Sequence, residues 1–270
     1  MTAPAEGVYD DRFYAAIDPE SASSARAVLP RVVDLVRPRV VIDVGCGSGA
    51  WMRAFRELGV DDVHGVDGAH VPTEFRVPGR FTEHDLLQPL DVGRRFDLAV
   101  CLELGEHLPF DRAAGLVADL VRLAPLVLFS AAVPGQGGTD HVNEQWPEYW
   151  TALFAERGWT CRDAIRPWIR SDEAVAWWYR QNIFLAADPA SDADLRAFPV
   201  LPATRPVHPV DYRGPLPPPP VPSTAAPAAA GPADAPVEPT LAEAATLAGR
   251  ALRGTWRRGW TTLARRRTPA

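Results

Sequence analysis

A glycine-rich turn is the first part of the chain whose residues could do chemistry. Gly45, Gly47 and Gly49 stand at alternate positions directly after the β-branched run 40–44. Because glycine lacks a Cβ, the backbone there can turn sharply and come close to a ligand. The free N–H groups of a helix expected to open at Ala50 would face the same point. The spacing therefore predicts a site for a nucleotide-like cofactor.

An acidic residue, Asp67, follows Gly45 by 22 residues and ends a second predicted strand, 63–66. A carboxylate at the tip of the second strand of such a fold accepts hydrogen bonds from the hydroxyls of a ribose. We therefore expect Asp67 to hold the sugar of the cofactor. A solvated aspartate in a turn beside Gly68 is the alternative.

A polar loop, residues 133–150, is the second part that could do chemistry. It has too few apolar side chains to form core, and polar loops on a rigid scaffold are where binding and catalysis concentrate. Histidine is the residue type that usually exchanges a proton near neutral pH, so His141 could accept the proton of a hydroxyl, with Asp140 or Glu144 orienting its ring. A histidine that only ties down the loop, or one that binds a metal, remains open. The side chains expected to hold the acceptor are Gln136, Asn143, Gln145 and Trp146.

The elements that must position these residues alternate between strand and helix. Runs of Val, Leu and Ile predict strands, and apolar residues at helical spacing predict helices. Repeated β-then-α order produces a parallel sheet, and ligands bind beyond the carboxyl ends of its strands. Two late strands joined by a short segment imply an antiparallel final pair. The expected strands are 40–44, 63–66, 80–84, 96–103, 126–132, 159–165 and 182–186, and the expected helices are 18–37 (capped by Asp18), 50–58, 110–124 and 149–157.

The glycine spacing alone also satisfies the loose dinucleotide-binding pattern, Gly45-x-Gly47-x-x-Ala50. The stretch 40–49 consists of hydrophobic residues, Asp43, a further hydrophobic residue and then Gly-Cys-Gly-Ser-Gly. As a whole it resembles the first motif of the class I S-adenosylmethionine-dependent methyltransferases. This resemblance implies a Rossmann-like α/β fold, with a seven-stranded, mostly parallel sheet, an antiparallel last strand and helices on both faces. It also implies S-adenosylmethionine as the cofactor and S-adenosylhomocysteine as the product.

The same resemblance implies which residues contact the cofactor. Asp85 and Leu86, after the third expected strand, would contact the adenine. Glu103 and His107, at the end of the fourth, would line the methionine end or the acceptor pocket, with a merely packed histidine as the alternative for His107. The full set is Asp43, Gly45, Cys46, Gly47, Gly49, Trp51, Asp67, Gly68, Asp85, Leu86, Glu103 and His107.

Residues 134–147 resemble a segment found in a bacterial subgroup of the same family. The segment begins with Pro-Gly-Gln-Gly-Gly and ends with His-Val-Asn-x-Gln-Trp-Pro. A methyl group activated as a sulfonium mainly needs an aligned nucleophile, with deprotonation added when the acceptor is a hydroxyl. Because amide and indole groups suit a polyhydroxylated ring, we expect O-methylation of a small-molecule or glycan-like acceptor. N- or carboxyl-methylation, an NAD-dependent oxidoreductase and a non-catalytic scaffold protein remain alternatives.

The composition narrows the class of protein further. A net charge of -6 argues against a surface that coats nucleic acid. The three cysteines form no Cys-x-x-Cys pair, the first residues lack a signal-peptide pattern and no run of eighteen apolar residues occurs, so we expect a cytoplasmic protein. No metal is predicted, because His64, His70 and His84 have no ligand-like framework around them.

Proline is concentrated late in the chain and predicts its domain organisation. Fourteen of the 28 prolines fall between Pro199 and Pro239. We therefore expect a catalytic domain over 1–190 and a disordered Pro/Ala-rich linker over 191–237. Residues 238–270 predict a basic amphipathic helix that could contact an anionic membrane surface or an acidic protein, or else cap the domain or fray. The sequence predicts no oligomeric state.

Overall fold

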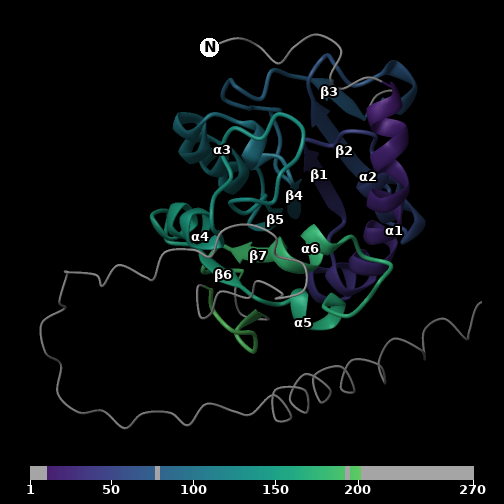
Figure 1. Ribbon diagram of the computed structural model, residues 1–270. Coiled ribbons are helices and arrows are strands. Elements are labelled where there is room, and N and C mark those ends of the chain that lie inside the picture. Colours follow the sequence, from purple (N-terminus) through teal and green to yellow (C-terminus); the bar gives the residue numbers. More distant parts are fainter. Residues whose placement is uncertain (1–10, 77–79, 192–194, 202–270) are drawn as a thin grey trace, which may run out of the picture. The chain divides into compact units, whose positions relative to one another are not determined.

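The computed structural model describes residues 11–76, 80–191 and 195–201, without the side chains of 11–16 (Figure 1). A seven-stranded sheet runs through these residues in the order β3-β2-β1-β4-β5-β7-β6. Neighbouring strands from β3 to β5 are parallel, and β7 is antiparallel to both β5 and β6. The strands are β1 (Val40–Val44), β2 (Asp62–Asp67), β3 (Phe81–Glu83), β4 (Leu98–Leu102), β5 (Leu126–Ser130), β6 (Thr160–Arg162) and β7 (Phe184–Ala187).

Helices cover both faces of this sheet, as Figure 1 shows with α1 and α2 on one side and α3 on the other. The arrangement confirms the predicted Rossmann-like α/β fold with its antiparallel ending. The helices are α1 (Asp11–Val36), α2 (Ala50–Glu57), α3 (Phe110–Leu123), α4 (Pro147–Ala155), α5 (Arg166–Ile169) and α6 (Trp177–Asn182), with short 3-10 turns η1 (Thr73–Phe75) and η2 (Gly105–His107). None of the helices in the described ranges is long and apolar enough to cross a membrane.

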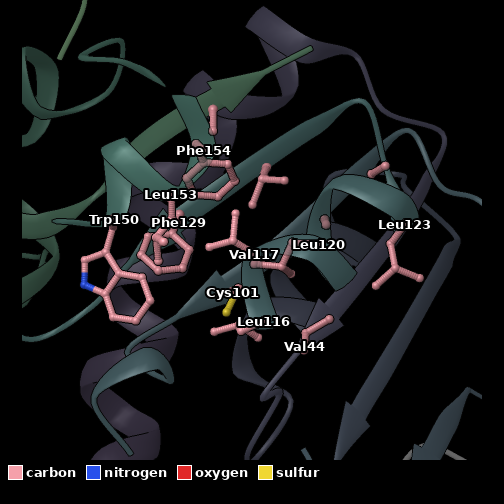
Figure 2. Packing of buried hydrophobic residues seen from close by; sticks show 14 of the residues in the cluster. Val44, Cys101, Leu116, Val117, Leu120, Leu123, Phe129, Trp150, Leu153 and Phe154 are labelled. Carbon is pink, nitrogen blue, oxygen red and sulfur yellow. The ribbon is translucent and has the colours of Figure 1, made fainter. Parts of the chain in front are cut away.

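Each face of the sheet has its own hydrophobic core. Side chains alternate along a strand, so Val41 packs in the core of one face while Ile42 packs in the core of the other. Figure 2 shows the core beneath α3 and α4, where Phe129 of β5 contacts Trp150 and Phe154 with ring centroids 5.1 and 5.7 Å away. These buried aromatic rings hold α4 on the sheet and so anchor the end of the polar loop.

The first helix is longer than the sequence predicts. It begins at Asp11, so Asp18 does not cap it and Pro19 lies within it. The Asp18 carboxylate instead accepts hydrogen bonds from the Ser48 hydroxyl and from Arg53, the latter at 2.5 Å. A cap is a local pattern, and here contacts with residues 30 and 35 positions away replace it. Asp18 thereby ties α1 to the glycine-rich turn.

The compact domain also extends further than the predicted boundary at 190. Leu195 and Leu201 are buried, and the N–H of Leu201 donates to the carbonyl of Cys161 at 2.9 Å. Proline content suggested an irregular segment, but these leucines give the chain apolar surface to bury beside β6. The rest of the predicted linker, 202–237, and the predicted helix, 238–270, lie outside the described residues.

Candidate active site

The glycine-rich turn joins β1 to α2 in the way that its residue types require. Gly45, Gly47 and Gly49 have φ values of 79°, 49° and 75°, in the left-handed region that side chains disfavour. A Cβ on Gly45 would also lie 3.0 Å from the Leu104 side chain. The N–H of Gly45 donates to the carbonyl of Val66 at 2.8 Å, which fixes the turn against the end of β2.

Asp67, at the end of β2, is held directly against this turn. Its carboxylate accepts hydrogen bonds from the N–H groups of Gly47 and Gly68, both at 2.7 Å, and lies 3.3 Å from His70. Oδ2 of Asp67 accepts only the Gly47 N–H among these contacts, so its second lone pair could accept a hydrogen bond from a hydroxyl of a bound ribose. The predicted contact between Asp67 and the cofactor sugar therefore remains compatible with the geometry.

Asp43 contributes a buried carboxyl with one oxygen that has no hydrogen-bond partner among the described residues. The residue lies at the end of β1, and the oxygen is Oδ2. Burial, and then the charge of Asp67, raises the pKa of Asp43 to about 8. A cationic group bound beside the turn would compensate this carboxyl, and S-adenosylmethionine carries a sulfonium and an ammonium. The turn and Asp43 thus fit the cofactor expected from the motif.

Two other residues expected at the turn point into the protein core. A Cβ on Gly65 would lie 2.8 Å from the Cys46 sulfur, so the Cys46 side chain faces β2 and only its backbone can face a ligand. Trp51 is buried and packs edge-on against Tyr179, with ring centroids 5.1 Å apart. Their side chains therefore support the turn from behind.

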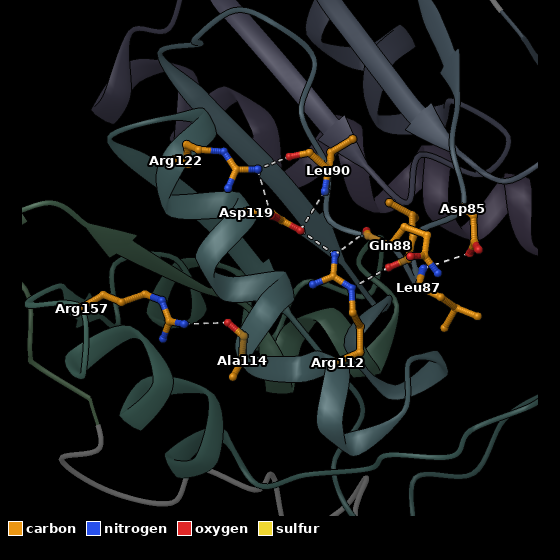
Figure 3. Close-up of polar contacts among 10 residues, drawn as sticks. Asp85, Leu87, Gln88, Leu90, Arg112, Ala114, Asp119, Arg122 and Arg157 are labelled. Carbon is orange, nitrogen blue, oxygen red and sulfur yellow. Dashed lines mark hydrogen bonds and ion pairs between the residues drawn. The ribbon is translucent and has the colours of Figure 1, made fainter. Parts of the chain in front are cut away.

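The segment expected to contact adenine is clamped to α3 (Figure 3). Arg112 donates to the carbonyl of Leu86 at 2.9 Å and to the Asp119 carboxylate at 2.5 Å, and Asp119 also accepts from the N–H of Leu90 at 3.1 Å. Leu86 is buried, whereas Asp85 is exposed. The Arg112–Asp119 ion pair thus fixes the backbone at Leu86 against α3.

Glu103, directly after β4, belongs to a polar network that joins three elements. It has a φ of 50°, an uncommon conformation for a residue with a side chain. Its carboxylate accepts hydrogen bonds from the side-chain amides of Gln136 at 2.8 Å and Asn182 at 3.4 Å, while burial raises its pKa. Sequence reasoning missed Asn182, which it placed in the last strand. The sequence feature that could have identified it is the run of three polar residues, 180–182, directly before the apolar strand.

The polar loop folds over η2 and brings together residues that are distant in sequence. The N–H groups of Val142 and Asn143 donate to the carbonyl of Glu106 at 2.8 and 3.0 Å. This pairing places the His141 ring edge-on to His107, with ring centroids 4.9 Å apart. One ligand atom each of Glu106, His107 and His141 lies within 4.8 Å of the others. The expectation of no metal site rested on other histidines and missed this cluster.

His141 has a defined orientation. Its Nδ1 lies 2.9 Å from the Glu144 carboxylate, which also accepts hydrogen bonds from the N–H groups of Gly135 and Gly137 at 2.7 and 2.8 Å. Of the two orienting residues considered from the sequence, Glu144 makes the contact. Asp140 is exposed and has a φ of 56°, so it shapes the loop backbone.

The amide side chains expected to hold the acceptor are engaged inside the protein. Asn143 is buried, with its Nδ2 3.5 Å from the Gly105 carbonyl and its Oδ1 accepting from Gln145 at 3.0 Å. Gln136 bonds to Glu103, as above, and Trp146 is partly buried at the start of α4. These contacts give the amides a role in loop structure, and their role in acceptor binding stays a prediction.

Comparison with known proteins places this site in a family. A family model described as a methyltransferase domain matches residues 18–179. No curated protein matches the chain. A solved structure of a proposed O-methyltransferase from Nostoc punctiforme PCC 73102 is 16% identical, covers 69% of this chain and 62% of its own, and has a TM-score of 0.52.

Two further solved structures have lower TM-scores. DesVI from Streptomyces venezuelae is 20% identical over 51% of this chain and 61% of its own, with a TM-score of 0.39. CalS10 from Micromonospora echinaspora, an amino pentose methyltransferase, is 17% identical over 67% of this chain and 98% of its own, with a TM-score of 0.49. This chain matches only about three fifths of the length of DesVI and of the Nostoc protein.

Proposed function

The chain belongs to the family of methyltransferase domains, of the class I S-adenosylmethionine-dependent type, and we propose that it methylates a hydroxyl group of a small or glycan-like acceptor. The family decides between the two cofactor types that the glycine spacing left open. S-adenosylmethionine supplies a methyl group already activated as a sulfonium, so the residues of the chain mainly bind and align the reactants.

On the cofactor side, we propose that the glycine turn and Asp43 face the cationic end and Asp67 the ribose. Asp85 and Leu86 would contact the adenine at the edge that Arg112 clamps. On the acceptor side, Glu103 and the loop 133–146 would close over the hydroxyl. The amide and indole groups of this loop suit a polyhydroxylated ring, which is the reason for expecting a glycan-like acceptor.

The observation that carries the acceptor proposal is the contact between His141 Nδ1 and Glu144 at 2.9 Å. A proton held on Nδ1 by the carboxylate leaves a lone pair on Nε2. We propose that this nitrogen takes the hydroxyl proton as the oxygen attacks the methyl carbon and the carbon–sulfur bond breaks. Gly135 and Gly137 keep the carboxylate in place, so the ring need not reorient during the reaction.

The test has one arm for each end of the site. Calorimetry with S-adenosylhomocysteine should show binding that Asp67→Ala weakens at least tenfold, because a ribose contact is lost. Labelled S-adenosylmethionine and a panel of polyols, glycosides, amines and carboxylic acids should then identify the acceptor. His141→Gln should lower the rate about 100-fold, a typical contribution of a general base. The control is Val142→Ala, because Val142 is the neighbour of His141 in the chain and its side chain is exposed.

Different outcomes of this test contradict different parts of the proposal. Equal S-adenosylhomocysteine affinity for Asp67→Ala and the native chain would refute the proposed ribose contact. Labelled amines or carboxylic acids in place of hydroxyl acceptors would replace O-methylation by the N- or carboxyl-methylation alternative. The cytoplasmic location and a contact of 238–270 with a membrane or an acidic protein also remain proposals, and the latter lies outside the described residues.

A further inference from the structure

The cluster of Glu106, His107 and His141 has the composition of a metal site. One ligand atom of each residue lies within 4.8 Å of the other two. One carboxylate with two imidazoles is a donor set that suits divalent first-row cations such as Zn²⁺ and Mn²⁺. Atoms bound about 2 Å from one ion lie at most about 4 Å apart, so a small movement of the side chains would close the site.

Glu106 provides a second, independent observation. Its relative exposure is 0%, and neither carboxyl oxygen makes a hydrogen bond of normal geometry within the described ranges, although the carboxyl lies beside that of Glu103 and beside the Ala132 backbone; the negative charge of Glu103 repels that of Glu106. A buried carboxyl without a partner is costly to keep ionised unless a cation compensates it. The two arginines of α3, the helix that follows Glu106 in the chain, are Arg112 and Arg122, and both already form ion pairs with Asp119. A bound cation would supply the compensation that these side chains do not.

Both histidines also make a hydrogen bond through one ring nitrogen, as metal-binding histidines usually do. A histidine that binds a metal generally donates its other ring N–H to a carboxylate or a carbonyl, which orients the ring. His141 has Glu144 at 2.9 Å from Nδ1, and the backbone of Asp140 accepts a hydrogen bond from His107. The structure therefore contains contacts of the kind that support metal ligands, as well as three residues that could be ligands.

The cluster lies where the acceptor of the proposed reaction is expected. Glu106 and His107 follow β4, and His141 lies in the loop after β5, at the carboxyl ends of neighbouring strands. Ligands of doubly wound sheets bind at this edge. The network of Glu103 with Gln136 and Asn182 borders the cluster, because the Glu103 carboxyl lies beside that of Glu106. An ion in the cluster would consequently contact an acceptor oxygen.

We propose that Glu106, His107 and His141 bind one divalent cation, which holds the acceptor hydroxyl beside the methyl group. This inference rests on the proposed function and changes one part of it. With the ion bound, His141 is a ligand through Nε2 and no longer the base. The ion makes the hydroxyl more acidic, its proton passes to water, the oxygen–methyl bond forms and the sulfur–methyl bond breaks.

The test measures ion binding separately from activity. The full chain, freed of any affinity tag and treated with a chelator, is titrated with Zn²⁺ by calorimetry and with Mn²⁺ by electron paramagnetic resonance. We expect one ion per chain. Glu106→Gln should weaken binding at least 100-fold. Glu144→Gln removes no ligand but weakens the support of His141 and of the loop backbone at Gly135 and Gly137, so it should weaken binding 10- to 100-fold. His64→Gln, whose ring bonds to Thr82 in the native chain, is the matched control and should bind normally.

Folding and cofactor binding distinguish the possible failures. Glu106→Gln removes an uncompensated buried carboxyl and keeps its shape, so the metal-free variant should melt no lower than the metal-free native chain. Unchanged ion affinity in Glu106→Gln, or full methyl transfer by the chelator-treated chain, would overturn the metal inference. If S-adenosylhomocysteine still binds in that case, His141 keeps its role as base. If the cofactor product does not bind either, the proposed function itself fails.

Discussion

Replacing Asp43 by asparagine should make the stability of the cofactor-free protein less sensitive to pH. Burial, and then the charge of Asp67, raises the pKa of the Asp43 carboxyl from 3.8 to about 8. A buried acid with a raised pKa keeps its proton in the folded state after the unfolded chain has lost it. Its contribution to stability is therefore fully present below about pH 4 and is lost as the pH rises towards about 8.

The size of this effect follows from the linkage between proton binding and folding. Between those two pH values, each pH unit lowers the free energy of unfolding of the native chain by about 1.4 kcal/mol through Asp43. The amide of the substituted asparagine cannot ionise, so the stability of Asp43→Asn minus that of the native chain should grow by about 3 kcal/mol from pH 5 to pH 7. Any constant cost of burying the amide cancels in this comparison.

Urea unfolding followed by tryptophan fluorescence at pH 5, 6, 7 and 8 measures this difference. The difference should level off above about pH 8, where the carboxyl of the folded native chain is also ionised. Asp91→Asn, in an exposed loop, is the control substitution. A difference between Asp43→Asn and the native chain that stays constant from pH 5 to pH 7 would refute the reasoning, because Asp43 would then ionise alike in both states.

Two further predictions concern residues that support the proposed site. Arg112→Met should cost about 3 kcal/mol of stability, since Asp119 stays buried with one partner fewer, and should weaken S-adenosylhomocysteine binding; urea unfolding and calorimetry would show both. Gly138→Ala should lower kcat/KM about 100-fold without changing cofactor affinity, because the new Cβ would lie 2.3 Å from His141 Nε2 and displace the ring. Gly137→Ala, with a φ of 71° but nothing within 4 Å, is its control, and equal losses in both variants would attribute the effect to backbone strain.

Local physics made much of the fold predictable from the sequence. The β-branched run before Gly45 and the alternate glycines after it imply a strand and a sharp turn, and the structure has both. Boundaries were less accurate: the predicted strand 126–132 ends at Ser130, and the predicted strand 159–165 is only Thr160–Arg162. Apolar residues continue past these strands because they pack against other elements, which composition does not distinguish from pairing in the sheet.

The candidate site also has a part that the sequence predicts and a part that it does not. Spacing and resemblance predict site residues at the strand ends, such as Asp67 and Glu103, and the structure places both residues at the ends of their strands, because each strand and turn is specified by its own few residues. The partners of those residues could not be predicted, since Asn182 reaches Glu103 across 79 positions and Glu106 meets His141 only after the loop folds back over η2. Sequence alone determined where chemistry could occur, through the steric limits of neighbouring residues. Only tertiary packing decided which side chains meet there, because contacts between distant residues depend on how whole layers stack.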